Sequence, residues 1–107
     1  MVGIMRHTCS RYAPREERIF AKVREIARAY DVQRIVLFGS RARRTHMEKS
    51  DVDLAVYGCS KFREFSLAVH EDVDTLLMFD LIHMDQHVSA ELAAAIAQDG
   101  VIIYEKI

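Results

Sequence analysis

Three aspartates stand out because each begins or interrupts an apolar run that is otherwise typical of a buried strand. Asp51 and Asp53 open the run 50–56, and Asp80 interrupts the run 77–84. If the first run is a strand, Asp51 and Asp53 share one face, because alternate strand residues point the same way. A buried carboxylate needs a cation, hydrogen-bond donors or an exposed edge. Mg²⁺ prefers oxygen ligands, so the pattern predicts a metal site for phosphoryl or nucleotidyl transfer.

A Gly-Ser turn before the aspartates has the composition of a phosphate-binding turn. The apolar run 35–38 ends at Gly39 and Ser40. Glycine lets the backbone approach a phosphate closely, and the serine hydroxyl and following amides can donate hydrogen bonds. Arg41 and Arg43 would add positive charge beside it. Each feature alone has an ordinary explanation, as a turn or as a solvated strand edge, but their combination favours a nucleotide site with Mg²⁺.

The elements that must position these residues alternate between helix and strand. Helical spacing begins at Pro14, and the charged residues between the apolar ones are expected on a solvated face. The order predicts a mixed sheet of about four strands with helices packed on it, in the α/β or α+β class. The predicted elements are a helix with apolar residues 19, 23, 26, 27 and 30, a strand 35–38, a short helix 40–44, a strand 52–56, a helix with the apolar stripe Phe62, Phe65, Val69, Val73 and Leu76, a strand 77–84, a helix from the Ser89 cap to Gly100, and a strand 101–104.

Composition limits the classes of protein that the chain can belong to. A length of 107 residues suits one domain, with residues 1–13 as a flexible lead-in and 14–107 as the folded part. Fifteen Lys and Arg against sixteen Asp and Glu leave no overall field that draws nucleic acid or membrane. No apolar run is long enough to span a bilayer and no signal peptide is evident, so a cytoplasmic protein is expected. Cys9 and Cys59 match no metal or redox spacing and are expected to be unpaired thiols.

The turn and the first two aspartates together carry a family resemblance. Segment 39–44 reads GSRARR and segment 50–54 reads SDVDL, with five residues between them. This resembles the G-S-x-A-R-G…S-D-x-D-L signature of the minimal nucleotidyltransferase (MNT) family, small members of the DNA polymerase beta-like superfamily. The resemblance extends from about Arg15 to Tyr104. The chain departs from the signature at Arg44, where the family often has glycine.

The resemblance implies a fold, an activity and a partner. It implies a nucleotidyltransferase fold in which Asp51, Asp53 and Asp80 bind two Mg²⁺ ions and Asp80 helps deprotonate the acceptor hydroxyl. Gly39 and Ser40 would hold the triphosphate of ATP. Many members are antitoxins encoded beside a HEPN-domain ribonuclease toxin, which implies transfer of AMP from ATP to a tyrosine of that toxin.

Two other functions remain open from the sequence. The chain could neutralise the toxin by direct binding without catalysis, or it could be a nucleotidyltransferase that modifies a small molecule or an RNA end together with a second subunit. A domain this small has no separate acceptor-binding domain, which favours a protein substrate. The apolar last strand also leaves a homo- or hetero-oligomer as an expectation.

Overall fold

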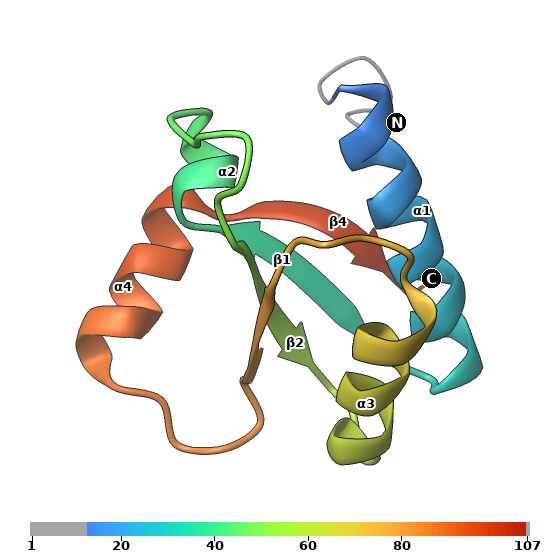
Figure 1. The fold of residues 1–107 in the computed structure, drawn as a ribbon. Coiled ribbons are helices and arrows are strands. Elements are labelled where there is room, and N and C mark those ends of the chain that lie inside the picture. The colour runs from blue at the N-terminus through green and yellow to red at the C-terminus, as the bar shows by residue number, and fades with distance from the viewer. Residues whose placement is uncertain (1–12, 107) are drawn as a thin grey trace.

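The computed structural model describes residues 13–106, and its elements follow the predicted order (Figure 1). Four strands form one mixed sheet with helices packed on it, which confirms the predicted fold class. The elements are α1 (Pro14–Ala29), β1 (Arg34–Phe38), α2 (Ser40–Arg43), β2 (Val52–Tyr57), α3 (Phe62–Asp72), β3 (Phe79–His83), α4 (Ala90–Asp99) and β4 (Val101–Glu105).

The sheet has the strand order β3-β2-β1-β4. β1 pairs antiparallel with both β2 and β4, whereas β2 and β3 are parallel and are joined through α3. The C-terminal end of β1 and the N-terminal ends of β2 and β3 therefore meet at the same end of the sheet. In Figure 1 this end is at the top, beside α2 and the loop that follows it.

Both faces of the sheet are covered by helices, as the continuous apolar runs require. On one face, β1 and β2 contribute Ile35, Leu37, Leu54 and Val56 to the main core beneath α1 and α3. On the other face, Val36, Phe38 and Ala55 form a smaller core with Ile96 of α4. Figure 1 shows α1 and α3 on one side of the sheet and α4 on the opposite side.

Local signals explain where the helices begin. Pro14 occupies the first turn of α1, where its missing N–H group removes no helical hydrogen bond. Before α4, the Oγ of Ser89 accepts a hydrogen bond of 3.2 Å from the amide of Leu92, so Ser89 is the predicted N-cap. Each large apolar side chain that these helices bury contributes about 1.5–3 kcal/mol to folding.

None of the helices among residues 13–106 is long and apolar enough to cross a membrane.

The region between α3 and β3 differs from the predicted pattern. α3 ends at Asp72, and Leu76, predicted on its apolar stripe, is fully exposed at 101%. That prediction was wrong because Val73 is extended and Thr75 begins a local turn, its Oγ1 accepting the amide of Leu77 at 3.1 Å. β3 is also shorter than the predicted strand 77–84, since it begins at Phe79. The apolar residues at 76–78 thus belong to the connecting loop.

The two cysteines have different outcomes. Cys59 is a buried free thiol just after β2, and burial raises its pKa above the ordinary value. Cys9 lies outside the described residues, as do all of the predicted lead-in residues except Ala13. The prediction of an unpaired thiol is confirmed for Cys59.

Candidate active site

The strand register brings two of the three predicted aspartates directly together. Asp53 of β2 is opposite Phe38 on one side and opposite Asp80 of β3 on the other. Partners in register on neighbouring strands point to the same face, so Asp53 and Asp80 share the face that α4 partly covers. The strand register therefore places side by side two of the three aspartates that the sequence analysis assigned to one site.

Asp51 lies one residue before β2 and is exposed. Strand alternation alone therefore does not fix the direction of its side chain, contrary to the simplest prediction. Its negative charge nevertheless acts on Asp53, whose pKa it helps to raise. All three aspartates thus belong to one electrostatic cluster at the end of the sheet, which we call the aspartate cluster.

Gly39 is required by the backbone and by the closeness of Asp53. It ends β1 with φ 77° and ψ −160°, a conformation that residues with a side chain rarely adopt. A Cβ atom built at this position would lie 2.3 Å from Oδ2 of Asp53. The Gly-Ser turn and the β2 carboxylate are therefore in direct contact, and only glycine leaves room between them.

The ionisation of Asp53 is opposed by its surroundings. Burial raises the pKa of this carboxyl above its ordinary value, and the charges of Asp80 and Asp51 raise it further. The positive charges of Arg43 and Arg41 offset part of this effect. A neighbouring cation would relieve the repulsion, because opposite charges within a few ångströms favour the ionised form.

Within residues 13–106, no ion pair or side-chain hydrogen bond compensates Asp51, Asp53 or Asp80. The same part of the chain contains no group of three or more His, Cys, Asp or Glu side chains already placed as a metal-ligand set. The aspartates are thus grouped by strand register and by charge. Their oxygen-only donors, and the repulsion that Arg43 and Arg41 offset only in part, fit a hard cation such as Mg²⁺.

The predicted nucleotide-binding residues Ser40 and Arg43 lie beside the aspartate cluster. Ser40 is half-buried and opens α2, the single helical turn that follows Gly39. Arg43 is exposed, and its Nη1 lies 3.1 Å from Oδ2 of Asp99 at the end of α4. Among residues 13–106, no hydrogen bond is made by the Ser40 hydroxyl, and the positive charge of Arg43 acts on Asp53.

Arg41 has a different environment from the one predicted. Its side chain is only 3% exposed. Its guanidinium donates to Glu16 through Nη1, and to the carbonyl oxygens of Ser50 and Glu48 through Nε and Nη2. The sequence predicted that the Arg41 side chain binds nucleotide. In the structure its guanidinium makes four hydrogen bonds to Glu16, Ser50 and Glu48 of the protein itself. Arg41 therefore acts on the site through its charge and through the segments that it holds.

Glu16 is a buried carboxylate close to the site, and the sequence analysis missed it. It was placed on the solvated face of the first helix, but it is 6% exposed. Burial opposes its ionisation, but hydrogen bonds from Arg44 and Arg41 and the charges of Arg44 and His46 outweigh this and lower its pKa. A signal was available, since Glu16 is spaced three, four and seven residues from buried Ile19, Phe20 and Val23.

Arg44 occupies the position where the family signature often has glycine. Its backbone is left-handed, with φ 63° and ψ 30°, which explains why glycine suits this position. Its Nη2 lies 2.9 Å from Oε1 of Glu16. The ion pair with a buried carboxylate offsets the strain of about 1 kcal/mol that a side chain brings to this conformation. Arg44 thus ends α2 in the manner of a glycine cap.

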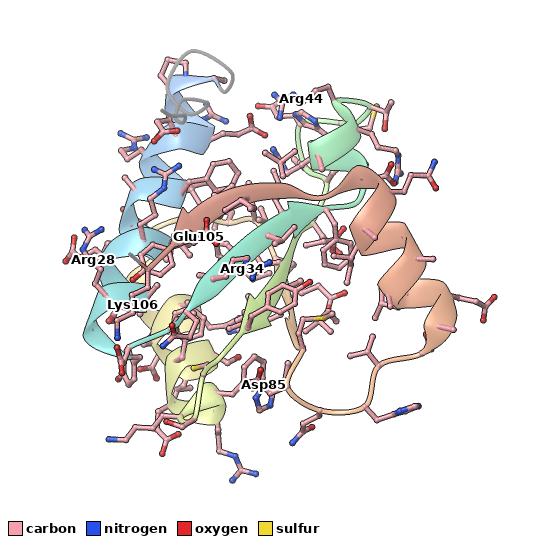
Figure 2. The ribbon with its side chains drawn as sticks, turned by 180° about the vertical axis from the view of Figure 1, so that it is seen from behind. Arg28, Arg34, Arg44, Asp85, Glu105 and Lys106 are labelled. Atoms are coloured by element: carbon pink, nitrogen blue, oxygen red, sulfur yellow. The ribbon has the colours of Figure 1, made fainter. Side chains whose placement is uncertain are left out.

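Other charged residues lie away from the site. Figure 2 shows Arg34 on β1, with Glu105 and Lys106 toward α1 and Arg44 at the opposite end beside α2. Arg34 pairs with Glu105 at 3.6 Å, and Lys106 pairs with Asp31. Asp85 accepts hydrogen bonds of 2.9 Å from the amides of Gly58 and Cys59, which lower its pKa. These contacts stabilise turns at the other end of the sheet.

A cavity of about 1040 Å³ opens between the start of α1, the loop after α2 and the loop before β3. Its lining includes Arg18, Lys49 and Leu77, together with Arg41 and His46. None of the three aspartates lines it. The cavity is therefore separate from the aspartate cluster, which lies on the face that α4 covers.

The fold and the site define a nucleotidyltransferase domain. Residues 21–107 match the family model described as polymerase beta, nucleotidyltransferase, so the chain belongs to this family. A search of curated proteins found no match.

Solved structures with the same fold come from toxin-antitoxin complexes. A chain of a toxin-antitoxin with AMP-PNP is 25% identical, with a TM-score of 0.58 over 81% of this chain and 73% of that chain. A chain of MntA-HepT is 20% identical, with a TM-score of 0.58 over 82% and 71%. A chain of a mutant MntA-HpeT complex is 22% identical, with a TM-score of 0.61 over 80% and 72%. These likenesses agree with the MNT resemblance of the sequence.

Proposed function

We propose that this protein is an antitoxin that transfers AMP from ATP to a tyrosine hydroxyl of a HEPN ribonuclease toxin, with two Mg²⁺ ions. The observation that carries the proposal is the aspartate cluster beside the Gly39 turn, in a chain of the nucleotidyltransferase family. The toxin partner is supported by neighbours that are toxin-antitoxin complexes, one of them with AMP-PNP, an analogue of ATP.

The residues divide into two groups with complementary charge. Asp51, Asp53 and Asp80 would hold Mg²⁺, which when bound neutralises phosphate charge and orients the reacting groups. Because Mg²⁺ keeps several waters and uses few carboxylates together with substrate phosphates, a ready-made set of three protein ligands is not required. The backbone at Gly39, the Ser40 hydroxyl and the Arg43 guanidinium would bind the triphosphate.

The transfer step follows from these positions. Asp80 accepts the proton of the acceptor hydroxyl, and the hydroxyl oxygen forms a bond to the α-phosphorus of ATP. The bond from that phosphorus to the bridging oxygen breaks, and pyrophosphate leaves with the electron pair. Asp80 is exposed at the edge strand β3, so an acceptor on a partner protein can reach it. A general base of this kind contributes about 10²–10⁴-fold to a rate.

The test is incubation of the protein with Mg²⁺, α-labelled ATP and the toxin encoded beside it. Label on a toxin tyrosine is expected with wild type and with Asp74→Asn, an exposed aspartate outside the cluster. The double variant Asp51→Asn, Asp53→Asn should lose at least about 10³-fold of the rate. Equal labelling by wild type and the double variant would refute the catalytic role of the cluster.

Growth of cells that express the toxin distinguishes the alternatives. Full protection by the double variant would show neutralisation by direct binding. Label on RNA ends or small molecules, with none on the toxin, would assign a different acceptor. We expect protection to fall together with labelling, because the proposed neutralisation is covalent.

A further inference from the structure

We propose that Arg41 is a positioning residue, which fixes the Gly-Ser turn relative to the aspartate segment, and that buried Glu16 holds Arg41 in place. The inference deepens the proposed function and rests on it for its kinetic part. It assigns to Arg41 and Glu16 a role in the geometry of the site without contact with the substrate. We refer to the two side chains and the carbonyl groups that they hold as the Arg41 clamp.

The clamp joins the two halves of the site across a loop. Arg41 follows Gly39 by two residues, so its backbone moves with the Gly-Ser turn. Its Nε and Nη2 donate to the carbonyl oxygen of Ser50 at 3.0 and 2.9 Å, and Nη2 also donates to that of Glu48 at 3.0 Å. Ser50 directly precedes Asp51. One planar guanidinium thus connects the predicted phosphate-binding turn to the start of the aspartate segment.

Apart from the clamp, the loop that it holds contacts the rest of the domain through the exposed ion pair Arg15–Glu48 at 3.3 Å and through His46, whose Nε2 lies 3.4 Å from Oε2 of Glu16. Residues 44–51 connect α2 to β2, and 47–50 close a local turn in which Ser50 Oγ accepts the amide of Met47 at 2.8 Å. Met47 is 76% exposed, and Glu48 and Lys49 are also exposed. Arg41 is therefore the buried side chain that anchors this turn to the body of the domain. Without it, the turn before Asp51 would depend on the exposed Arg15–Glu48 pair and on the contact of His46 with Glu16.

Glu16 fixes the guanidinium from the opposite side. Its Oε2 lies 2.6 Å from Arg41 Nη1, and its Oε1 lies 2.9 Å from Arg44 Nη2. Because Glu16 belongs to α1, the clamp also ties α2 to the largest helix of the domain. A buried guanidinium without a counter-charge is strongly unfavourable, so Arg41 depends on Glu16 for its position.

A positioning role and a direct nucleotide contact predict different kinetics. Misplacement of reacting groups by about 1 Å lowers the chemical step up to about 10²-fold. Loss of a direct contact made equally in the ground and transition states raises KM and leaves kcat unchanged. The buried contacts of Arg41 predict the first pattern.

The test uses the full-length protein with Arg41→Lys and Glu16→Gln, and Glu25→Gln as a matched control. Lysine keeps the charge but lacks the fork that reaches three partners at once. Glu25 is on the same helix as Glu16, but its side chain is 65% exposed. The measurements are amide hydrogen exchange of residues 48–53 and the kcat and KM for ATP in toxin labelling, each on protein shown to be folded.

We expect the amides of residues 48–53 to exchange at least about tenfold faster than in wild type in both Arg41→Lys and Glu16→Gln. In Glu25→Gln their exchange rates should equal those of wild type. We also expect kcat to fall at least about tenfold while KM for ATP changes less than about threefold. Unchanged exchange, or a rise in KM with constant kcat, would overturn the clamp. If wild type labels no acceptor, the proposed function fails, and hydrogen exchange still decides the clamp. If Glu16→Gln does not fold, Arg41→Lys decides it.

Discussion

Glu16 and Asp53 are both carboxylates placed against the core of one small domain, but their neighbours carry opposite charges. Glu16 is surrounded by Arg41, Arg44 and His46, and its pKa is lowered although burial opposes this. Asp53 is half-buried beside Asp80 and Asp51, and its pKa is raised, first by its partial burial and then by the charges of these two aspartates. The first carboxylate has counter-charges in direct contact, whereas the second has like charges as its nearest charged neighbours and is only partly offset by Arg43 and Arg41.

The difference separates a carboxylate that stabilises the fold from carboxylates that oppose folding, which are the ones proposed to act in catalysis. A paired buried carboxylate contributes to folding, whereas grouped carboxylates without a partner oppose it and persist where function requires them. The two sites are also physically linked, because Arg41 pairs with Glu16 and holds the segment before Asp51. The predictions below each change one side of this comparison.

The largest effect is expected for Glu16→Gln. The substitution leaves Arg41 as a buried charge without its counter-ion and should lower the free energy of unfolding by about 3–5 kcal/mol. Since the pKa of Glu16 is lowered on folding, its stabilisation is present above its unfolded pKa and is lost as pH falls through the folded value. Urea unfolding at pH 7 and at acid pH measures both effects.

Glu25→Gln is the control for this experiment. Glu25 forms an exposed ion pair with Lys22, and its loss should change stability by less than about 0.5 kcal/mol. Equal losses for Glu16→Gln and Glu25→Gln would show that burial of the Glu16 pair has no energetic consequence.

Gly39→Ala should have the next largest effect. Alanine would have to adopt the positive φ of 77° at this position, and its methyl group would lie 2.3 Å from Oδ2 of Asp53. We therefore expect the free energy of unfolding to fall by about 1–3 kcal/mol. In an Asp53→Ala background Oδ2 and Cγ are absent and the nearest remaining atom of residue 53 is Cβ, at the ordinary contact distance of 3.5 Å, so only the backbone strain remains. A double-mutant cycle by urea unfolding measures this coupling. Additive losses would contradict direct contact between the turn and the aspartate.

Much of this architecture follows from local sequence pattern. The apolar run 35–38 has the length and composition of a buried strand and is β1, and the predicted order of helices and strands is the observed one. The register that places Asp53 opposite Asp80 comes from the structure. Gly39 was recognisable because few other residues tolerate a sharp turn beside a phosphate site. The end of α3 could not be recognised from the sequence, because the apolar spacing of the helix continues to Leu76 although the chain forms a local turn at Thr75.

The contacts of Arg41 with Glu16 could not be predicted from sequence patterns, for a different reason. Arg41 is an arginine among three in a short segment, and only tertiary contacts show that it turns inward to Glu16 while Arg43 stays exposed. Glu16 is separated from Arg41 by 25 residues. Side-chain pairing over that distance depends on how α1 packs against α2, which no periodicity specifies.

Addition of Mg²⁺ should stabilise the folded protein through the aspartate cluster and not through Glu16. Binding to the folded state raises the free energy of unfolding by about 1.4 kcal/mol at tenfold excess over Kd. Thermal unfolding in MgCl₂ against KCl of equal ionic strength should show this increase for wild type and Asp74→Asn. The variant Asp51→Asn, Asp53→Asn should show no increase. An equal shift in that variant would place the ion elsewhere.

The smallest effect is expected for Asp53→Asn, and its sign is opposite to that of Glu16→Gln. Because the pKa of Asp53 is raised on folding, its ionised form opposes folding above the folded pKa, and this penalty disappears below the unfolded value. At pH 7 without Mg²⁺, the variant should be more stable than wild type by about 0.5–1 kcal/mol. The difference should vanish toward acid pH, and it should reverse with saturating Mg²⁺, which stabilises only the wild type. A variant less stable than wild type at pH 7 without Mg²⁺ would mean that the carboxylate already has a compensating partner.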